Sequence, residues 1–345
     1  MMEIYLDKDF ARNFWASQLS NTSIWKDFKD NFLNQVRYFN LITNYASEDE
    51  MLKSENGRLF YKIFSAKVRG IKYTGEINKN KWVNDANYSS GGYKFYLIEF
   101  TDSDLISISN KGYEIISTTT LEDRWSNYLI KKIDKAIDIP ANQSNPDLFN
   151  SWKDLKIVSK CPTNSIIIID NYILCDTKGQ RIEDNLIPAL DNLVPQKHEG
   201  TLDVLIVSEK IQSNVKSIDI STKAKEIHDQ LIKYFEKYPS IEFKFKILIH
   251  DKTFHPEDGM EIHDRIIFTN YYTLTCGVGF NLFNGRKRKC VNSEVQIRFN
   301  FQPYEMQKYP RHLISLKKYI AKVLRTEVVP GRFKFYPDVD CKLLE

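Results

Sequence analysis

In the second half of the chain, short apolar runs alternate with amphipathic segments. The stretches 165–170 and 202–208, which are rich in isoleucine, valine and leucine, are typical of strands buried on both faces of a sheet. Apolar residues recur every three to four positions over 182–194 and 224–238, which predicts a helix after each of those strands. Further elements are expected as strands over 241–249 and 294–301 and a helix over 312–324. This order predicts a β-α-β-α-β core, extended by more strands, in a sheet with helices on both faces.

The first half is dominated by aromatic residues at helical spacing. Over 8–45, positions such as Phe10, Phe14 and Phe28 recur at spacings near three and four, which predicts helix. Such a stripe is more typical of a packed core than of a ligand platform. A second helix is predicted over 52–68, before Gly70. We therefore expect a helix-rich beginning of the chain.

A strand and a turn interrupt this helical pattern. Alternating apolar residues at 105–109 lead into Asn110-Lys111-Gly112, an arrangement that resembles the wing of winged-helix domains. We therefore expect an α+β domain with a winged-helix element near 93–137. The other elements expected here are loops over 71–93, a strand over 93–100 and a helix over 121–137.

The best linker candidate is the segment 140–146, Pro-Ala-Asn-Gln-Ser-Asn-Pro, because proline, asparagine and serine disfavour regular structure. A chain of 345 residues suits two domains of medium size. We expect a helix-rich α+β domain over 1–145 and an α/β domain over 155–345.

The densest polar cluster opens a predicted hairpin at 262–281. His263 and Arg265 share one face of its first strand because they are two residues apart, and Asp264 points to the other face. The second strand ends in Gly277-Val278-Gly279, where backbone amides can approach an anion because no Cβ blocks them. A histidine, a guanidinium and bare amides at one end of a sheet suit a phosphate.

This hairpin resembles the phospholipase D superfamily, whose members carry His-x-Lys, then four residues and Asp, and later a segment of glycine and asparagine. His263 matches the family histidine, which is the nucleophile in active members. Arg265 stands at the lysine position and Asn270 at the aspartate position, and 277–281 stands where the glycine and asparagine segment would be. The resemblance implies a phosphodiester ligand and a mixed sheet covered by helices.

The closer resemblance is to the phospholipase D-like C-terminal domain of MIT-domain proteins and its bacterial relatives. These proteins also show His-Asp-Arg, an apolar strand and then Gly-x-Gly with a hydrophobic residue. The similarity covers about 155–330 and implies binding of acidic phosphates without hydrolysis. Active enzymes of the superfamily bring two motifs together, so hydrolysis by this chain would need His263 of a second copy.

Several residues are candidates for a site at this end of the sheet. Asp170 ends a buried strand, where it would either hydrogen-bond His263, orient Arg265, or cap a turn with Asn171. The candidates for catalysis are His263, Arg265, Asn270 and Asp170. The candidates for phosphate binding are Arg265, Gly277, Gly279 and Asn281.

A basic segment follows the Gly-x-Gly. Arg286, Lys287, Arg288 and Lys289 would contact a nucleic-acid backbone, or they form a solvated surface turn. His250, His255 and His263 lie close in sequence, but no Asp, Glu or Cys spacing supports a metal site. Neither a metal nor a cofactor is therefore expected.

Composition narrows the class of protein. An apolar content of 42% permits a packed core, and a net charge of +4 does not by itself indicate nucleic-acid binding. Five cysteines without a Cys-x-x-Cys pair predict neither a zinc site nor a disulfide framework. No signal peptide is visible at the start and no apolar run reaches the roughly 18–20 residues of a membrane span, so a cytoplasmic location is expected.

These observations lead to three hypotheses for function. The first is a nucleic-acid-binding protein of a bacterial conflict or antiviral defence system, with a degenerate phospholipase D-like site. The second is a metal-independent nuclease that acts as a homodimer through His263. The third is a non-enzymatic protein-interaction subunit of a larger complex.

Overall fold

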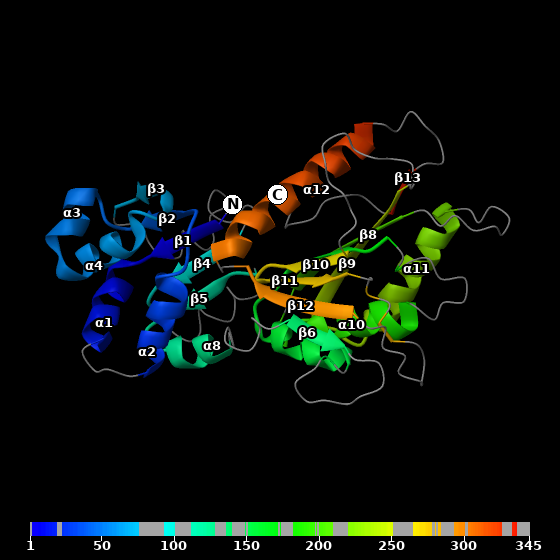
Figure 1. The fold of residues 1–345 in the computed structure, drawn as a ribbon, viewed down its shortest axis with the longest axis horizontal. Helices are drawn as coiled ribbons and strands as arrows, with labels where there is room; N and C mark the ends of the chain where they lie inside the picture. The colour runs from blue at the N-terminus through cyan, green and yellow to red at the C-terminus, as the bar shows by residue number, and fades with distance from the viewer. Residues whose placement is uncertain are drawn as a thin grey trace. The chain divides into compact units, whose positions relative to one another are not determined.

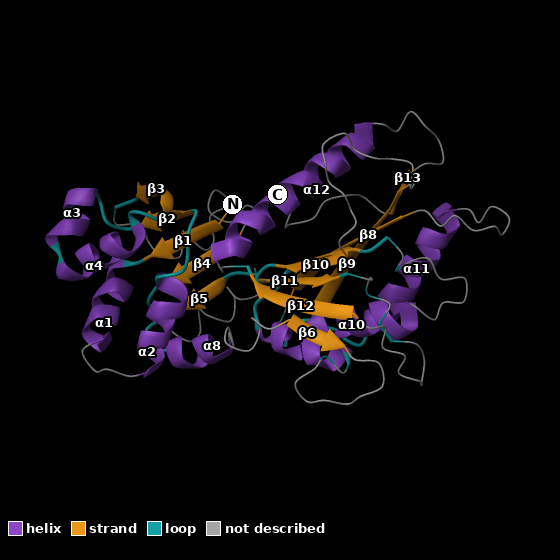
Figure 2. Cartoon of the chain, viewed as in Figure 1, coloured by secondary structure: helices purple, strands orange, loops and turns teal. Residues whose placement is uncertain are grey.

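A computed structural model gives the fold, drawn in Figure 1 and coloured by secondary structure in Figure 2. The chain divides into two compact units, each described here by itself. The N-terminal unit comprises 1–132 with 299–310, and the C-terminal unit comprises 133–298 with 311–344. The structure describes residues 2–18, 23–75, 93–100, 112–127, 136–139, 149, 151–171, 173, 182–196, 198, 200–209, 220–250, 265–277, 280, 282–283, 293–300, 303–325 and 333–336.

The N-terminal unit contains a five-stranded sheet in the order β3-β2-β1-β4-β5. Every neighbouring pair in it is parallel. The strand order changes direction between β1 and β4, which makes this a doubly wound sheet with a topological switch point. The strands are β1 (Met2–Leu6), β2 (Phe39–Thr43), β3 (Val68–Tyr73), β4 (Tyr93–Leu97) and β5 (Glu114–Ile116).

The prediction of helix over 8–45 is wrong at its end. Helices α1 (Lys8–Gln18) and α2 (Ser23–Phe28) and the π-helical turn η1 (Lys29–Leu33) are present, but β2 occupies 39–43. A short apolar run cannot be assigned to helix or strand by periodicity alone. The predicted second helix is divided into α3 (Glu48–Lys53) and α4 (Glu55–Phe64), because Ser54 caps the latter by accepting a hydrogen bond from the Gly57 amide.

The predicted wing, with its strand at 105–109, lies largely outside the described residues, because the structure does not describe 101–111. The strands on either side of that stretch, β4 and β5, pair in parallel, with Phe95 opposite Glu114, whereas a wing is an antiparallel hairpin. The predicted helix over 121–137 ends early, as α8 (Leu121–Asn127), and Ala136–Ile139 forms strand β6. The N-terminal unit is therefore a doubly wound α/β unit and not an α+β one.

The aromatic stripe of the N-terminal unit is core, as the periodicity indicated. Phe10, Phe14 and Phe28 are fully buried. The Phe14 ring lies 5.4 Å from that of Phe60 on α4, measured between ring centroids. The Phe28 ring lies 5.0 Å from that of Trp125 on α8. Helices on this side of the sheet are thus held together by contacts among aromatic rings.

The C-terminal unit contains an eight-stranded mixed sheet in the order β13-β9-β8-β7-β10-β11-β12-β6. Its centre is parallel, β7 with β8 and β8 with β9, and β10 pairs antiparallel with β7. This agrees with the predicted β-α-β-α-β core. The strands are β7 (Ser165–Ile169), β8 (Gly200–Glu209), β9 (Ile241–His250), β10 (Arg265–Thr269), β11 (Tyr272–Cys276), β12 (Ser293–Phe299) and β13 (Phe333–Tyr336).

Helices lie on both faces of this sheet, as predicted. Phe235 of α11 packs on Phe245, with ring centroids 5.4 Å apart. His312 of α12 lies edge-on to Phe268, which by the register of the strands belongs to the opposite face. The other helical segments are η2 (Trp152–Lys160), η3 (Ile182–Leu186) and α10 (Ile187–Leu193), and α11 and α12 span Ile220–Phe235 and Pro303–Arg325.

The boundary between the units differs from the predicted one. It falls after Lys132, because β6 at 136–139 pairs with β12 of the C-terminal sheet. The predicted linker 140–146 lies entirely outside the described residues. Within the part of the chain that the structure describes, no helix is long and apolar enough to cross a membrane.

Candidate functional site

Three of the predicted site residues meet at one end of the C-terminal sheet. Asp170 directly follows β7, and Arg265 begins β10, whose register places Ile266 opposite Ile169. On the other side, Arg265 is opposite Cys276, the last residue of β11, and Gly277 follows. Asp170, Arg265 and Gly277 thus share the edge formed by the carboxyl ends of the parallel strands, where α/β sheets bind ligands.

Arg265 and Asp170 each hold a described residue that follows β11, Gly277 and Phe280 respectively. Nη1 of Arg265 donates a hydrogen bond of 2.7 Å to the carbonyl of Gly277. Asp170 is 1% exposed, and its Oδ2 accepts a hydrogen bond of 2.6 Å from the amide of Phe280. The sequence predicted contacts of Asp170 with His263, Arg265 or a turn at Asn171, and did not predict Phe280 as its partner.

Asn270 lies at the opposite end of the sheet, so its expected role in the same site is wrong. Its Oδ1 accepts hydrogen bonds from the amides of Asn164 and Ser165 at 3.1 and 3.2 Å, before and at the start of β7. Its Nδ2 donates to Oδ1 of Asn164 at 3.0 Å. Five residues of extended strand, or roughly 17 Å, separate it from Arg265. Asn270 therefore closes the hairpin turn and cannot take the place of a catalytic aspartate.

The other predicted site residues lie outside the part of the chain that the structure describes. These residues are His263, Gly279 and Asn281 and the basic segment Arg286, Lys287, Arg288 and Lys289. The structure places their neighbours in the chain, Arg265, Gly277, Phe280 and Leu282.

Asn185 is a polar residue of this region that sequence reasoning missed. It is fully buried on η3, and its amide group makes two hydrogen bonds to one residue. Nδ2 donates to the carbonyl of Phe283 at 2.8 Å, and Oδ1 accepts from the amide of Phe283 at 2.9 Å. The indole of Trp152 also donates to Oδ1, at 3.3 Å. The available signal was an asparagine directly before the apolar run at 186–190.

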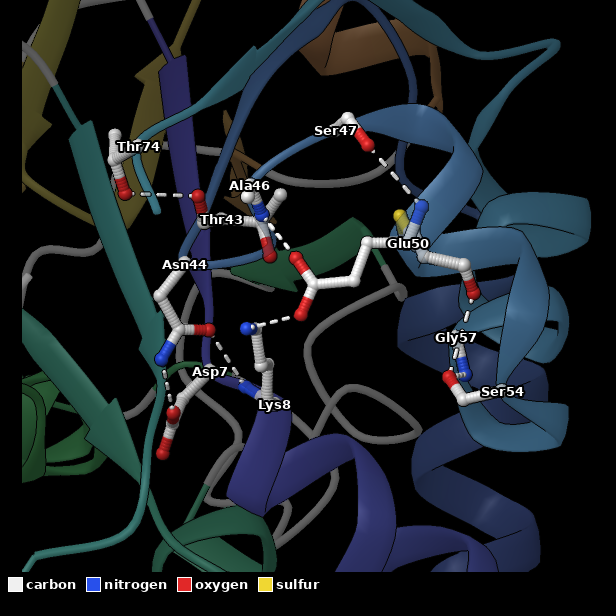
Figure 3. Close-up of polar contacts among 11 residues, drawn as sticks. Asp7, Lys8, Thr43, Asn44, Ala46, Ser47, Glu50, Ser54, Gly57 and Thr74 are labelled. Carbon is white, nitrogen blue, oxygen red and sulfur yellow. Dashed lines mark hydrogen bonds and ion pairs between the residues drawn. The ribbon is translucent and has the colours of Figure 1, made fainter. Parts of the chain in front are cut away.

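A second polar cluster lies at the carboxyl edge of the N-terminal sheet (Figure 3). Asp7 follows β1 and is fully buried, and Asn44 follows β2. Nδ2 of Asn44 donates to Oδ1 of Asp7 at 2.8 Å, and Oδ1 of Asn44 accepts from the amide of Lys8 at 2.8 Å. Nζ of Lys8 is paired with the carboxylate of Glu50 on α3. The loops after β1 and β2 are thus held together by side chains.

The loops after β4 and β5 join the same edge. The amide of Glu99 approaches Oδ2 of Asp7 at 3.4 Å, and Oε1 of Glu99 accepts from the amide of Thr118 at 3.1 Å. Asp7 and Glu99 therefore flank the switch point between β1 and β4. Among the described residues, no three His, Cys, Asp or Glu side chains come together in a way that could hold a metal ion.

Comparison of the chain with known proteins identifies no family. No protein-family model matches the sequence, and no curated protein is significantly similar to it. What the structure establishes is a mixed α/β protein with two sheets.

Proposed function

We propose that the C-terminal unit binds phosphodiesters, in the simplest case a nucleic acid, at the edge that carries Arg265 and Gly277. One observation carries this proposal: a guanidinium, a buried carboxylate and a glycine from separate strand ends meet where the fold predicts a ligand. The resemblance of the His263 to Asn281 segment to phospholipase D-like domains supports the same ligand class.

The surroundings of Gly277 support access to the backbone at this edge. A Cβ built on Gly277 would meet no heavy atom within 4 Å. Space of this kind lets a ligand oxygen approach the main chain. A guanidinium has five N–H donors in a planar arrangement. Arg265 can therefore donate to the Gly277 carbonyl and also to a phosphate oxygen.

The proposal is tested with a short fluorescein-labelled single-stranded DNA and fluorescence anisotropy over a series of salt concentrations. Wild-type chain is expected to bind with an affinity that falls as salt rises. Arg265→Gln should weaken binding and reduce the slope of log K against log salt by about 0.7, the value for one phosphate contact on a single strand. Arg58→Gln is the matched control, because Arg58 is an exposed arginine on α4. Equal slopes for all three proteins would contradict the proposal.

Binding without hydrolysis is the form of the proposal that we favour. Asn270, which stands at the family's aspartate position, is remote from Arg265 and hydrogen-bonded to Asn164. Hydrolysis would also need a second His263 from another copy of the chain. A nuclease assay in EDTA with wild type and His263→Ala, combined with analytical ultracentrifugation, distinguishes binding alone from hydrolysis. Cleavage that survives EDTA, requires a dimer and disappears in the variant would establish a nuclease instead.

A further inference from the structure

Three described residues that follow β11, here called the anchored residues, are Gly277, Phe280 and Phe283, and each is hydrogen-bonded to a side chain elsewhere in the C-terminal unit. Arg265 of β10 holds the carbonyl of Gly277, and Asp170 after β7 holds the amide of Phe280. Asn185 of η3 holds both the amide and the carbonyl of Phe283. The three anchoring side chains come from different elements, so the placement of the anchored residues does not depend on their own stretch of chain alone.

Side-chain packing also holds the anchored residues in place. Phe280 and Leu282 are fully buried. The Phe283 ring lies 5.7 Å from Trp152, and the Phe280 ring lies 6.3 Å from it, measured between centroids. The Trp152 indole also donates a hydrogen bond to Asn185, so it contacts both these two rings and the side chain that holds Phe283. Buried hydrogen bonds of this kind favour a single conformation of the anchored residues.

Anchoring of these residues in the free protein has a consequence for affinity. The apparent dissociation constant equals the intrinsic one divided by the fraction of molecules in the binding conformation. Anchors that keep this fraction near unity in the free protein therefore increase affinity without touching the ligand. The side chain of Asn185 is well suited to this, because it is buried and binds both the amide and the carbonyl of Phe283, and its loss removes both hydrogen bonds at once.

We propose that Asn185 and Asp170 are positioning residues, which hold Phe283 and Phe280 in the conformation that binds a phosphate group before the ligand arrives. This inference rests on the proposed function and assigns a role to Asn185 that the hairpin motif does not contain. It also changes the role of Asp170, from a partner of the catalytic histidine to the anchor of the Phe280 amide. The ligand class is an oxyanion of a phosphodiester backbone, received by Arg265 and the main chain near Gly277.

The test uses the full chain and the same labelled single-stranded DNA. If the anchored conformation falls to a tenth of the population in Asn185→Ala, the dissociation constant rises roughly tenfold. The salt slope should stay at the wild-type value, because no phosphate contact is removed. Hydrogen exchange of the Phe280 and Phe283 amides should become faster. Asn192→Ala is the matched control, since Asn192 is a buried asparagine of α10 whose Nδ2 bonds only locally, to Pro188.

A conservative pair of variants separates positioning from general stability. Asp170→Asn retains an oxygen that can accept from the Phe280 amide, so it should keep most of the affinity, whereas Asp170→Ala should lose it. Asn185→Asp keeps the size of the side chain and serves if Asn185→Ala does not fold. It retains the acceptor for Phe283 but loses the donor, so reduced affinity is again expected.

The outcomes distinguish this inference from the function on which it rests. If wild type does not bind the DNA, or Arg265→Gln leaves the salt slope unchanged, the proposed function is refuted and the inference with it. If wild type binds and Arg265→Gln lowers the slope, but Asn185→Ala binds as tightly as Asn192→Ala, the inference alone is refuted. A change of salt slope in Asn185→Ala would also refute it, because Asn185 would then contribute to a phosphate contact.

Discussion

Glu114 provides a prediction about stability whose size follows from its position. The side chain is 1% exposed on β5, and Nη1 of Arg124 on α8 lies 3.8 Å from it. Burial raises the pKa of Glu114 to about 8, against a smaller lowering effect of the Arg124 charge. The folded unit therefore keeps this carboxyl protonated at pH values where the unfolded chain has lost the proton.

The sign of the effect on stability follows from proton binding. Between about pH 4.5 and about pH 8 the folded state binds one proton more than the unfolded state. The free energy of unfolding must then fall as pH rises through this window, by about 1.4 kcal/mol per pH unit. Over the whole window this amounts to on the order of 5 kcal/mol, and the dependence ends above the folded pKa.

The variant Glu114→Gln removes the ionisable group and keeps the shape. We expect its free energy of unfolding to match that of wild type near the lower end of the window and to exceed it at the upper end. Urea titrations at several pH values would measure this free energy of unfolding. Hydrogen exchange of peptides from the N-terminal unit would provide a local measure. Glu122→Gln is the control, because Glu122 is an exposed glutamate in the first turn of α8. Parallel pH profiles for wild type and Glu114→Gln would refute the reasoning.

Two further predictions concern the edges of the two sheets. Gly277→Val should leave thermal stability nearly unchanged, because no heavy atom lies within 4 Å of the added Cβ, while it weakens DNA binding in the anisotropy assay; unchanged affinity would show that the ligand does not approach this main chain. Asn44→Ala should lower the free energy of unfolding by about 1–3 kcal/mol, because buried Asp7 loses a hydrogen-bond donor. Asn34→Ala, which removes only an exposed contact to Asp30, is its control in urea denaturation.

The sequence predicted the C-terminal sheet better than the N-terminal one for a physical reason. The runs 166–169 and 204–207 are uninterrupted and rich in isoleucine and valine, a pattern that helices disfavour and that is typical of buried parallel strands. Strand β2, in contrast, has five residues and follows aromatic residues at helical spacing. Its strand state depends on pairing with β1 and β3, which periodicity within one segment does not reveal.

The candidate site was predictable only where it is local in sequence. The spacing of Arg265 and Gly277 around a hairpin follows from strand pairing, and the structure brings them together. Asn270 lies in the same hairpin, and its alignment with the aspartate of the family motif predicted that it joins the site. It instead follows β10 at the end opposite to Arg265. Asn185 could not be assigned, because its partner Phe283 is 98 residues distant in the chain.

The two carboxyl edges also show why fold alone does not assign a phosphate. A doubly wound sheet often binds phosphate at the turn after its first strand, through glycine amides at a helix N-terminus. Here that turn reads Leu6-Asp7-Lys8, without glycine, and the Asp7 carboxylate occupies the switch point. A fixed negative charge repels a phosphate, and the nearby ammonium of Lys8 is paired with Glu50. The C-terminal edge also carries a buried carboxylate, Asp170, but there a guanidinium and an open glycine backbone lie at the same strand ends. For this reason we propose the C-terminal edge as the phosphodiester site, on the chemistry of its side chains more than on its topology.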